Sequence, residues 1–444
     1  MPPTLDRLRL TLSAGPSTPR QLIETPGISQ PTLSRLVKSA GDAVVRIGAA
    51  RSIQYALRDA GRGFVDVPVY RVVADGTLRR LGVLVPVRPD GFVMQQDDGK
   101  VLYSDGLPWW LMDMRPDGFL GRAWAQKHGA GLGLPSRLVE WSDSHALRAL
   151  IAAGYDVPGN LILGDVARER FLSAPDAQPA SRADYPDLAV AAERGDQPGS
   201  SAGGEQPKFI AYAGDSHLIV KFTSEDDNPV SRRWRDLLLA EHHALETLRA
   251  GGVSAPRSEV VDLAGRRFLE IERFDRIGIR GRRAIHSLTA LDAELVGNAS
   301  APWPEIVVAL VRVGVVTQDA LAHVALLYAF GTSIGNTDMH NGNLSFMAEH
   351  GRPYGAAPAY DMLPMVFRPG PGGNLPDGIP AATLRASVDS STWRQALDLA
   401  AAAVHRLDDA ARAALVDAEK PLAVEGLGGA GAVDDVRYAV EGGV

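Results

Sequence analysis

Short amphipathic segments separated by turn residues make up the first sixty positions. Leucines recur on one side of residues 5–12, and Gly15-Pro16-Ser17 predicts the end of that helix. A short helix through Leu22 follows, and Leu33, Leu36 and Val37 predict a third helix at 30–38 because their spacing is i, i+3 and i+4. Apolar runs at 44–47 and 53–57 flank a small-residue turn and predict a hairpin. Residues 1–60 therefore predict a winged helix-turn-helix domain.

The exposed side of the 30–38 helix carries polar and basic residues, as a DNA-reading helix does. The candidate DNA contacts are Gln30, Thr32, Ser34, Arg35 and Lys38. Residues 1–58 hold eight Lys/Arg and three Asp/Glu, a net +5, whereas the whole chain is 46 − 53 = −7, so the remainder is −12. This asymmetry indicates an anionic partner for the first segment. The alternative is a small helical cap that packs on the next domain.

Further along the chain the pattern changes from strands to helices. Asp-Gly pairs at 75–76, 90–91, 98–99 and 105–106 predict antiparallel hairpins from Val67 onward. Residues 174–200 lack periodicity and predict a linker. Beyond it we expect strands at 209–212 and 218–222, a helix at 233–250, strands at 258–263 and 267–272, and helices from 290 to 336 and from 392 to 424. An α+β chain with a β-rich half and then a helical half has the layout of a bilobal kinase.

Composition excludes several classes of protein. The chain is 45% hydrophobic and 22% charged, which is typical of a soluble globular protein. No stretch reaches the roughly 20 apolar residues of a membrane helix, and the N-terminus does not resemble a secretory signal, so we expect a cytoplasmic protein. With no cysteine in the chain, disulfides, a thiolate nucleophile and cysteine-ligated zinc are excluded.

The most informative stretch for chemistry is 335–343. Asp338 and Asn343 are five positions apart, which is the spacing of the base and the metal-binding amide in a kinase catalytic loop. Asp361 follows eighteen residues later, where the second metal ligand of a kinase lies, although Tyr360-Asp361-Met362 replaces Asp-Phe-Gly. Taken alone, the Asp-Asn spacing is also typical of a polar loop that caps the preceding helix.

A lysine lies within an otherwise apolar predicted strand upstream. Lys221 is either on the solvent side of an edge strand or a phosphate ligand. Glu241 on the following helix is a candidate ion-pair partner, and His242 and Glu246 are alternatives for that role. Taken alone, Lys221 favours the edge-strand interpretation, but with Glu241 as its partner the kinase interpretation is favoured.

Two more segments complete a predicted nucleotide site. Residues 200–208 could hold phosphates through backbone amides, although this loop is neither a Walker loop nor the kinase glycine loop and could be the end of a linker. Residues 271–276 follow a strand at the position of a kinase hinge, and their backbone could pair with adenine.

Together these segments resemble HipA-type toxin kinases. SSAGGEQPKF, LIVKF, IERFDR, NTDMHNGNLSF and AYDMLPM occur in the family's order and near its spacing, over roughly residues 65–420. The fused N-terminal domain resembles the YjjJ-like branch. The resemblance implies a bilobal HipA/protein-kinase-like fold after the predicted winged helix, with a β-rich N-terminal lobe (61–275) and a helical C-terminal lobe (276–425). The Gly/Ala-rich composition of the last residues predicts a flexible tail (426–444).

The resemblance also assigns roles to individual residues. Asp338 becomes the catalytic base, Asn343 and Asp361 become the Mg²⁺ ligands, and Lys221 binds ATP phosphates. Ser201, or its neighbour Ser200, matches the serine that such kinases autophosphorylate, and His340 is expected to structure the catalytic loop. The remaining predicted ATP contacts are Gly203, Gly204, Gln206 and Lys208 in the phosphate loop, Glu272, Arg273 and Phe274 in the hinge, and His340 in the catalytic loop.

The implied function is an ATP- and Mg²⁺-dependent Ser/Thr protein kinase that acts as the toxin of a toxin-antitoxin system. Its expected target is a translation component such as an aminoacyl-tRNA synthetase, with DNA binding as autoregulation. A small antitoxin protein and a homodimer are possible partners. The alternative function is a transcriptional regulator whose inactive kinase fold senses nucleotide. A nuclease is disfavoured because no paired-carboxylate or His-metal cluster is recognisable.

Overall fold

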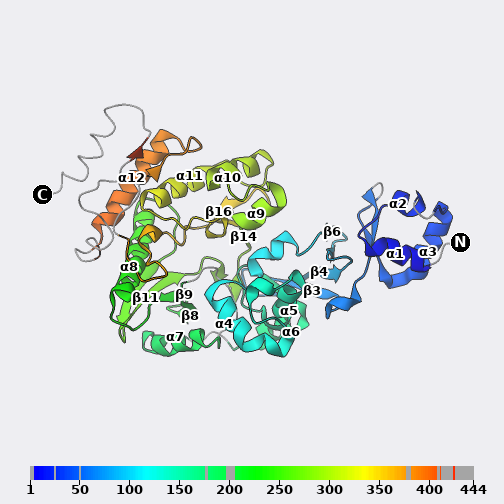
Figure 1. Cartoon of the computed structure of the whole chain (residues 1–444), viewed down its shortest axis with the longest axis horizontal. Helices are drawn as coiled ribbons and strands as arrows, with labels where there is room; N and C mark the ends of the chain where they lie inside the picture. The colour runs from blue at the N-terminus through cyan, green and yellow to red at the C-terminus, as the bar shows by residue number, and fades with distance from the viewer. Residues whose placement is uncertain are drawn as a thin grey trace.

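The computed structural model describes residues 5–24, 27–49, 52–175, 179–196, 206–376, 382–407, 411 and 424–425. The molecule is elongated, with the N-terminal helices at one end and α12 (Ser390–His405) near the other (Figure 1). Between them lie a five-stranded sheet, a four-stranded sheet and a group of helices. The mixture of helices and strands confirms the predicted fold class. Within the described ranges, no helix combines the length and the apolar character that a membrane span requires.

The N-terminal unit contains three helices and a hairpin, in the predicted order. Leu8, Leu12, Leu22 and Leu33 form its core, which confirms the apolar faces predicted for these helices. Strands β1 and β2 pair antiparallel, and Tyr55 also bridges to Ser17. The elements are α1 (Leu5–Ser13), α2 (Pro19–Glu24), α3 (Gln30–Ala40), β1 (Val44–Ile47) and β2 (Gln54–Leu57).

A second unit, here called the middle unit, spans residues 67–173. Its antiparallel sheet has the order β6-β5-β4-β3-β7. The β1–β2 hairpin packs on this sheet, because Val45, Ile47 and Ala56 share a buried cluster with Val85 and Val93. The strands are β3 (Val67–Val72), β4 (Leu78–Pro86), β5 (Phe92–Gln96), β6 (Val101–Ser104) and β7 (Leu161–Leu163), and the helices are α4 (Gly118–His128), α5 (Asp143–Ala153) and α6 (Gly164–Ser173).

The middle unit corrects one of the turn predictions. The Asp-Gly pairs at 75–76, 90–91 and 98–99 do join neighbouring strands, but the pair at 105–106 does not. After β6 the chain instead enters a 3₁₀ helix at Trp109–Met114, and α4 to α6 follow in a region that the sequence indicated only as β-rich. An Asp-Gly pair favours a turn but does not determine what comes after it.

The β lobe is built on a sheet of order β10-β11-β9-β8. The expected linker at 174–200 is wrong in part, because it contains the helix α7 (Tyr185–Glu193). Tyr185 is fully buried against Phe209 and Phe268 of the sheet, so tertiary packing stabilises a helix that shows little amphipathic pattern. The remaining elements are β8 (Lys208–Ala213), β9 (Ser216–Phe222), α8 (Pro229–Ala250), β10 (Ser258–Leu263) and β11 (Arg266–Glu272).

The helical lobe contains the largest buried cluster among the described residues. Its core includes Trp303, Phe330 and Trp393, each almost fully buried. A small sheet, β14-β15-β16, lies beside these helices, on the side that is turned toward the β lobe (Figure 1). The elements are β12 (Arg276–Ile277), β13 (Gly281–Arg282), β14 (Ile285–Ser287), α9 (Leu288–Leu295), α10 (Trp303–Arg312), α11 (Gln318–Ser333), β15 (Ser345–Met347), β16 (Gly355–Ala356), α12, β17 (Ala382–Thr383) and β18 (Val424–Glu425).

Candidate active site

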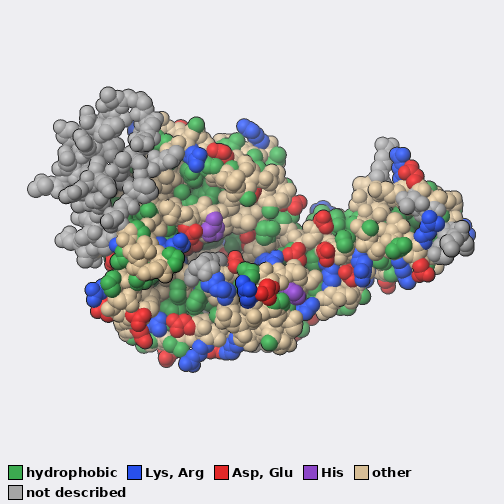
Figure 2. Space-filling view, in the orientation of Figure 1, with side chains coloured by type: hydrophobic (Ala, Val, Ile, Leu, Met, Phe, Trp, Pro, Cys, Tyr) green, Lys and Arg blue, Asp and Glu red, His purple; other side chains and the backbone are tan. Residues whose placement is uncertain are grey.

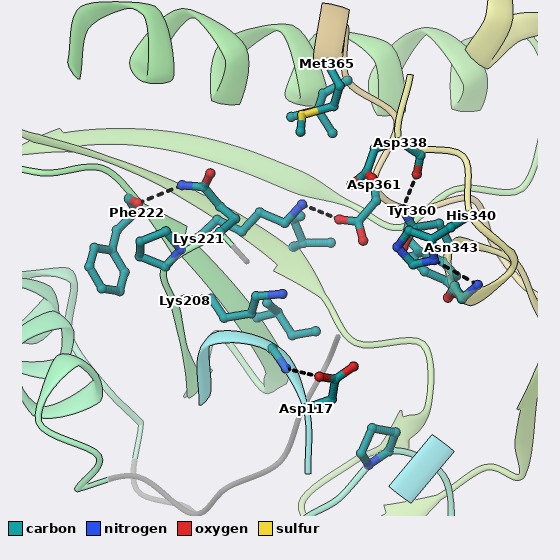
Figure 3. A pocket seen from close by; sticks show the side chains of 18 of the residues that line it. Asp117, Lys208, Lys221, Phe222, Asp338, His340, Asn343, Tyr360, Asp361 and Met365 are labelled. Atoms are coloured by element: carbon teal, nitrogen blue, oxygen red, sulfur yellow. Dashed lines mark hydrogen bonds and ion pairs between the residues drawn. The ribbon is translucent and has the colours of Figure 1, made fainter. Parts of the chain in front are cut away.

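A cavity of about 1440 Å³ lies between the β lobe and the helical lobe. Figure 2 shows the surface hollowed between these two lobes. The cavity is lined by residues of β9, the 271–275 segment, the 338–345 loop and Asp361. The middle unit adds Met112, Asp113 and residues 115–118. The predicted catalytic residues, which the sequence spreads over 140 positions, therefore face one space (Figure 3).

Lys221 forms the centre of a buried ion network. Its Nζ lies 2.6 and 2.8 Å from the two carboxylate oxygens of Glu241 on α8, and it also contacts Asp361 Oδ1. Glu241 is completely buried and Lys221 is 5% exposed. The structure thus pairs Lys221 with Glu241 and not with His242, whose ring faces Ser258, or with Glu246, which pairs with Arg249.

Burial and charge act in opposite directions on this network. Burial lowers the pKa of Lys221, but the carboxylates of Asp361 and Glu241 outweigh it and raise that pKa above its ordinary value. Burial raises the pKa of Glu241 in spite of Lys221. For Asp361 the effect of burial is outweighed by the charge of Lys221, and the pKa is lowered. Lys221 therefore remains charged, and Asp361 is held as a carboxylate.

The 336–343 loop is organised by two asparagines. Asn343 Nδ2 donates to the carbonyl oxygen of Asp338 at 2.8 Å. Asn336 accepts from the Asp338 N–H at 3.0 Å through Oδ1 and donates to the Asp361 carbonyl at 2.9 Å through Nδ2. Asn336 is 4% exposed and joins the predicted base to the predicted metal ligand. The sequence prediction missed this role, although the residue is two positions before Asp338.

Tyr360 holds the segment of Asp361 against the same loop. Its hydroxyl donates to the Gly342 carbonyl at 2.8 Å and lies 2.7 Å from Ser345 Oγ. Burial raises the pKa of Tyr360 above its ordinary range, so the hydroxyl stays protonated. Asp361 itself adopts φ = 53°, a left-handed conformation that is uncommon for a residue with a side chain and is enriched at functional sites. His340 accepts from the Gly342 N–H through Nδ1 at 3.0 Å, which fits the structuring role predicted for it.

The donor set suits a hard cation held jointly with phosphates. Asp361 offers carboxylate oxygens, and Asn343 offers Oδ1, because its Nδ2 is bound to Asp338. Mg²⁺ prefers such oxygen ligands and is commonly held by one or two protein groups together with substrate phosphates. Within the described residues no cluster of three or more acidic or histidine ligands occurs. The oxygen donors of Asp361 and Asn343 fit a Mg²⁺ ion that is shared with substrate phosphates.

The predicted hinge lies along the edge of the cavity. The backbone N–H of Glu272 donates to the Arg257 carbonyl at 2.9 Å, and that of Arg273 donates to the His217 carbonyl at 2.8 Å. The Arg273 guanidinium binds Asp275. Phe274 packs against Tyr360, with 5.8 Å between ring centroids. Sheet bonds and buried charges therefore hold this segment in place.

Part of the predicted phosphate loop can be described. Ser200, Ser201, Gly203 and Gly204 lie outside the described residues. Lys208 lies directly across from Lys221 in the β8–β9 pairing and is 3% exposed, so two lysines face the same end of the cavity (Figure 3). The positive charge of Lys208 also contributes to lowering the pKa of Asp361. Gln206 is used structurally, because its Nε2 donates to the Phe222 carbonyl at 3.0 Å.

The middle unit adds a carboxylate that the sequence prediction missed. Asp113 lies on the cavity wall and accepts from the N–H of Ser287 at 2.7 Å and from its hydroxyl. Ser287 caps α9 by accepting from Ala290. Burial raises the pKa of Asp113, although these hydrogen bonds oppose the effect. The two partners are 174 positions apart, so no local pattern could indicate the contact.

The predicted DNA contacts belong to α3 of the N-terminal unit, at the opposite end of the molecule from α12 (Figure 1). Gln30, Ser34, Arg35 and Lys38 are exposed on α3, and Thr32 is half-buried. Arg35 Nη2 donates to Thr32 Oγ1 at 3.3 Å. Leu33 is buried on the opposite side of the helix, so the predicted division of α3 into an inner and an outer face is confirmed.

The two lobes, the Lys221–Glu241 pair and the loop of Asp338 and Asn343 define a kinase-like fold. A family model for the HipA-like C-terminal domain matches residues 200–421, and a model for the middle domain of YjjJ-like toxins matches residues 64–172. Toxin YjjJ of Escherichia coli (strain K12) is 39% identical over 399 residues, which cover 88% of this chain and 89% of that protein. The chain therefore belongs to the HipA-like toxin family, in its YjjJ-like branch.

Solved structures show more distant similarity. HipA of Shewanella oneidensis MR-1, solved with HipB and operator DNA, is 14% identical and gives a TM-score of 0.42, covering 77% of this chain and 88% of that chain. The Helicobacter pylori proinflammatory kinase CtkA is 15% identical and gives a TM-score of 0.30, covering 37% of this chain and 56% of that chain.

Proposed function

We propose that this chain is an ATP-dependent Ser/Thr protein kinase whose activity makes it a toxin. The observation that carries the proposal is the position of Lys221, buried between Glu241 and Asp361 and facing the Asp338–Asn343 loop across one cavity. Charge-coupled lysine, glutamate and aspartate groups around a phosphate site are what phosphoryl transfer requires. A translation component such as an aminoacyl-tRNA synthetase is the proposed target, and the cytoplasm the proposed compartment.

Each residue has a distinct role in the proposed reaction. Lys221, oriented by Glu241, neutralises charge on the phosphates that are not transferred. Asp338 orients the acceptor hydroxyl and takes its proton, while Asn336 and Asn343 fix the loop that carries Asp338. Asp361 and Asn343 would hold Mg²⁺, which would screen the charge of the transferred phosphate. Positioning and electrostatics supply most of the rate acceleration in such a site.

Asp338→Asn tests the proposal, because it removes the base and keeps the size of the side chain. The purified chain would be incubated with radiolabelled ATP and a cell lysate. We expect the variant to transfer about 10²–10⁴-fold less phosphate than wild type while it still binds nucleotide. Asp319→Asn, an exposed carboxylate at the start of α11, is the matched control and should transfer normally. Equal labelling by wild type and Asp338→Asn would contradict the proposal.

Autophosphorylation is a second measurable part of the proposal. Mass spectrometry of the expressed wild-type chain should find phosphate on Ser201 or Ser200, and the Asp338→Asn variant should lack it. If wild type binds ATP but transfers phosphate neither to itself nor to any lysate protein, the alternative of a nucleotide-sensing regulator is favoured.

The exposed basic face of α3 supports a further role in DNA binding. By this proposal the N-terminal unit represses the chain's own gene, and a second copy of the chain could provide symmetry for a palindromic site. The same proposal includes a small antitoxin protein as a further partner.

A further inference from the structure

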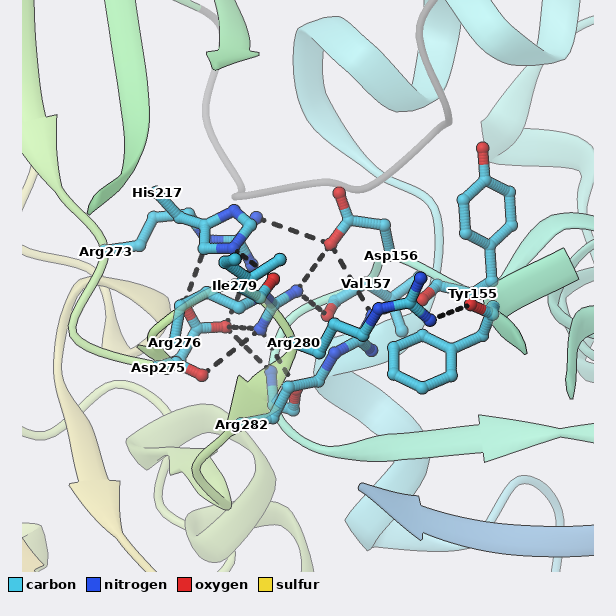
Figure 4. Close-up of polar contacts among 12 residues, drawn as sticks. Tyr155, Asp156, Val157, His217, Arg273, Asp275, Arg276, Ile279, Arg280 and Arg282 are labelled. Carbon is cyan, nitrogen blue, oxygen red and sulfur yellow. Dashed lines mark hydrogen bonds and ion pairs between the residues drawn. The ribbon is translucent and has the colours of Figure 1, made fainter. Parts of the chain in front are cut away.

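A buried polar cluster joins the middle unit to the predicted hinge. We call it the junction cluster, and Figure 4 shows its charged groups converging between loop 155–159 and the segment 273–282. Four of its side chains are between 3% and 8% exposed, and that of Asp156 is 26% exposed. The members are Asp156, Arg273, Asp275, Arg276 and Arg282.

Two carboxylates connect the three guanidinium groups. Asp275 binds Arg273 through both oxygens, at 2.9 and 3.0 Å, and lies 2.6 Å from Arg276. Asp156 Oδ1 lies 2.7 Å from Arg276, 3.7 Å from Arg273 and 3.9 Å from Arg282. One oxygen of the middle unit thus faces all three arginines.

Backbone groups of the same loop reinforce these contacts. Arg276 donates to the carbonyls of Gly159 at 3.1 Å and Val157 at 2.8 Å, and Arg282 donates to that of Tyr155. In return the Gly159 N–H donates to Asp275 at 3.1 Å. Loop 155–159 is therefore bound to the hinge side at several points, and Asp156 supplies its negative charge.

The charge balance makes Asp156 the critical member. Three guanidinium groups face two carboxylates, a net +1, and removing Asp156 would give +2 in a buried place. A buried charge without a partner is costly, so the arginines would move or draw in water. Arg273 links the junction cluster to the cavity. It lines the cavity together with its neighbours Glu272 and Phe274. Its backbone N–H donates to the His217 carbonyl.

We infer that Asp156 is a positioning residue: its carboxylate holds Arg273 and Arg276, and through them the Glu272–Phe274 hinge, in the geometry that accepts a nucleotide base. The middle unit is then part of the nucleotide site although it belongs to neither lobe. This inference rests on the proposed function, because it takes the cavity to be the ATP site.

The test measures binding of a fluorescent ATP analogue, mant-ATP with Mg²⁺, to the full chain. Asp156→Asn should raise the Kd for mant-ATP about tenfold, a change of roughly 1.4 kcal/mol. It should raise KM for ATP by a similar factor and change kcat less than twofold, because Asp156 contacts neither Asp338, the proposed catalytic base, nor Lys221, the proposed phosphate-binding lysine. Asp165→Asn is the matched control, since Asp165 lies on α6 of the same unit and binds Tyr70.

A double variant separates charge balance from general damage. Asp156→Asn with Arg282→Gln returns the cluster to +1 and should recover most of the lost affinity, which a merely unfolded middle unit would not do. Unchanged affinity in Asp156→Asn, an equal loss in Asp165→Asn, or no recovery in the double variant would overturn the inference.

Hydrogen exchange distinguishes failure of the inference from failure of the proposed function. Backbone amides of 272–276 should exchange faster in Asp156→Asn than in wild type, with or without nucleotide. If wild type binds no mant-ATP, the proposed function fails, and the exchange rates still decide whether Asp156 positions the hinge. Equal exchange in both proteins would overturn the positioning role.

Discussion

The Lys221 ammonium group lies 2.6 and 2.8 Å from the two oxygens of Glu241, and this pair joins the β9 strand to the α8 helix. Asp361 binds the same ammonium group from the helical lobe. One buried cation therefore binds two carboxylates, Glu241 of the β lobe and Asp361 of the helical lobe. Removing it would leave those carboxylates facing each other without compensation.

Lys221→Met should destabilise the fold in a pH-dependent way. Without Lys221, the pKa of Glu241, already raised by burial, should rise further. A carboxyl whose folded pKa is raised contributes full stability below its unfolded pKa and loses it as pH rises through the folded pKa. We expect a loss of about 3 kcal/mol at pH 8 that becomes smaller toward pH 5. Urea unfolding from pH 5 to 8 would measure it.

The control for this prediction is Lys100→Met, which removes an exposed lysine of the β5–β6 turn. It should change stability little at any of these pH values. A loss in Lys221→Met that is the same at pH 5 and pH 8 would show that lost packing dominates over the uncompensated carboxylates.

Tyr360→Phe should make the segment that carries Asp361 less rigid while it keeps the aromatic ring in the cavity wall. The change removes the hydroxyl that donates to the Gly342 carbonyl and contacts Ser345, so a half-buried acceptor loses its partner. We expect a loss of about 1–2 kcal/mol in unfolding free energy. Because Asp361 is the next residue, the Mg²⁺ concentration for half-maximal phosphate transfer should also rise several-fold.

Tyr70→Phe provides the comparison, since the Tyr70 hydroxyl binds Asp165 at 2.6 Å in the middle unit. It also removes a tyrosine hydroxyl from a hydrogen bond, but it should leave the Mg²⁺ dependence unchanged. If both variants shift the Mg²⁺ dependence equally, Tyr360 has no particular connection to the metal ligands.

Motif order made part of the candidate site predictable. Asp338 and Asn343 share one loop and Lys221 stands out in an apolar strand, but each pattern alone also fits a structural role, so their functional assignment depended on the family resemblance. Asp113 and Asp156 could not be found in this way, because their partners Ser287 and Arg276 are 174 and 120 positions away. Both belong to a unit whose helices the sequence did not indicate. Contacts between units depend on tertiary structure, which neither hydrophobic periodicity nor turn residues can predict.

Asp113→Asn should flatten the dependence of stability on pH. Burial raises the pKa of Asp113 in the folded chain. Its contribution to stability is therefore complete below the unfolded pKa and is lost as pH rises through the folded value. The asparagine cannot titrate, so between pH 4 and 7 wild type should lose more stability than the variant. Thermal unfolding of both proteins across this range would measure the difference, and parallel curves would contradict the prediction.

Arg35→Ala and Lys38→Ala should weaken DNA binding by the N-terminal unit. Both side chains are exposed on α3, and neither belongs to the Leu8–Leu33 core, so the fold should be preserved. If each contacts one phosphate, each substitution should reduce the slope of log K against log salt by about 1.

Gel shifts on the chain's own upstream DNA at several salt concentrations would measure this change. Arg20→Ala on α2, where Arg20 pairs with Glu24, is the control and should bind normally. If all three variants weaken binding to the same degree with unchanged salt slopes, α3 is not the reading helix. If wild type does not bind at all, the packing of β1–β2 on the middle unit becomes the better account of this domain. In that case the N-terminal unit is the helical cap that its sequence also allowed.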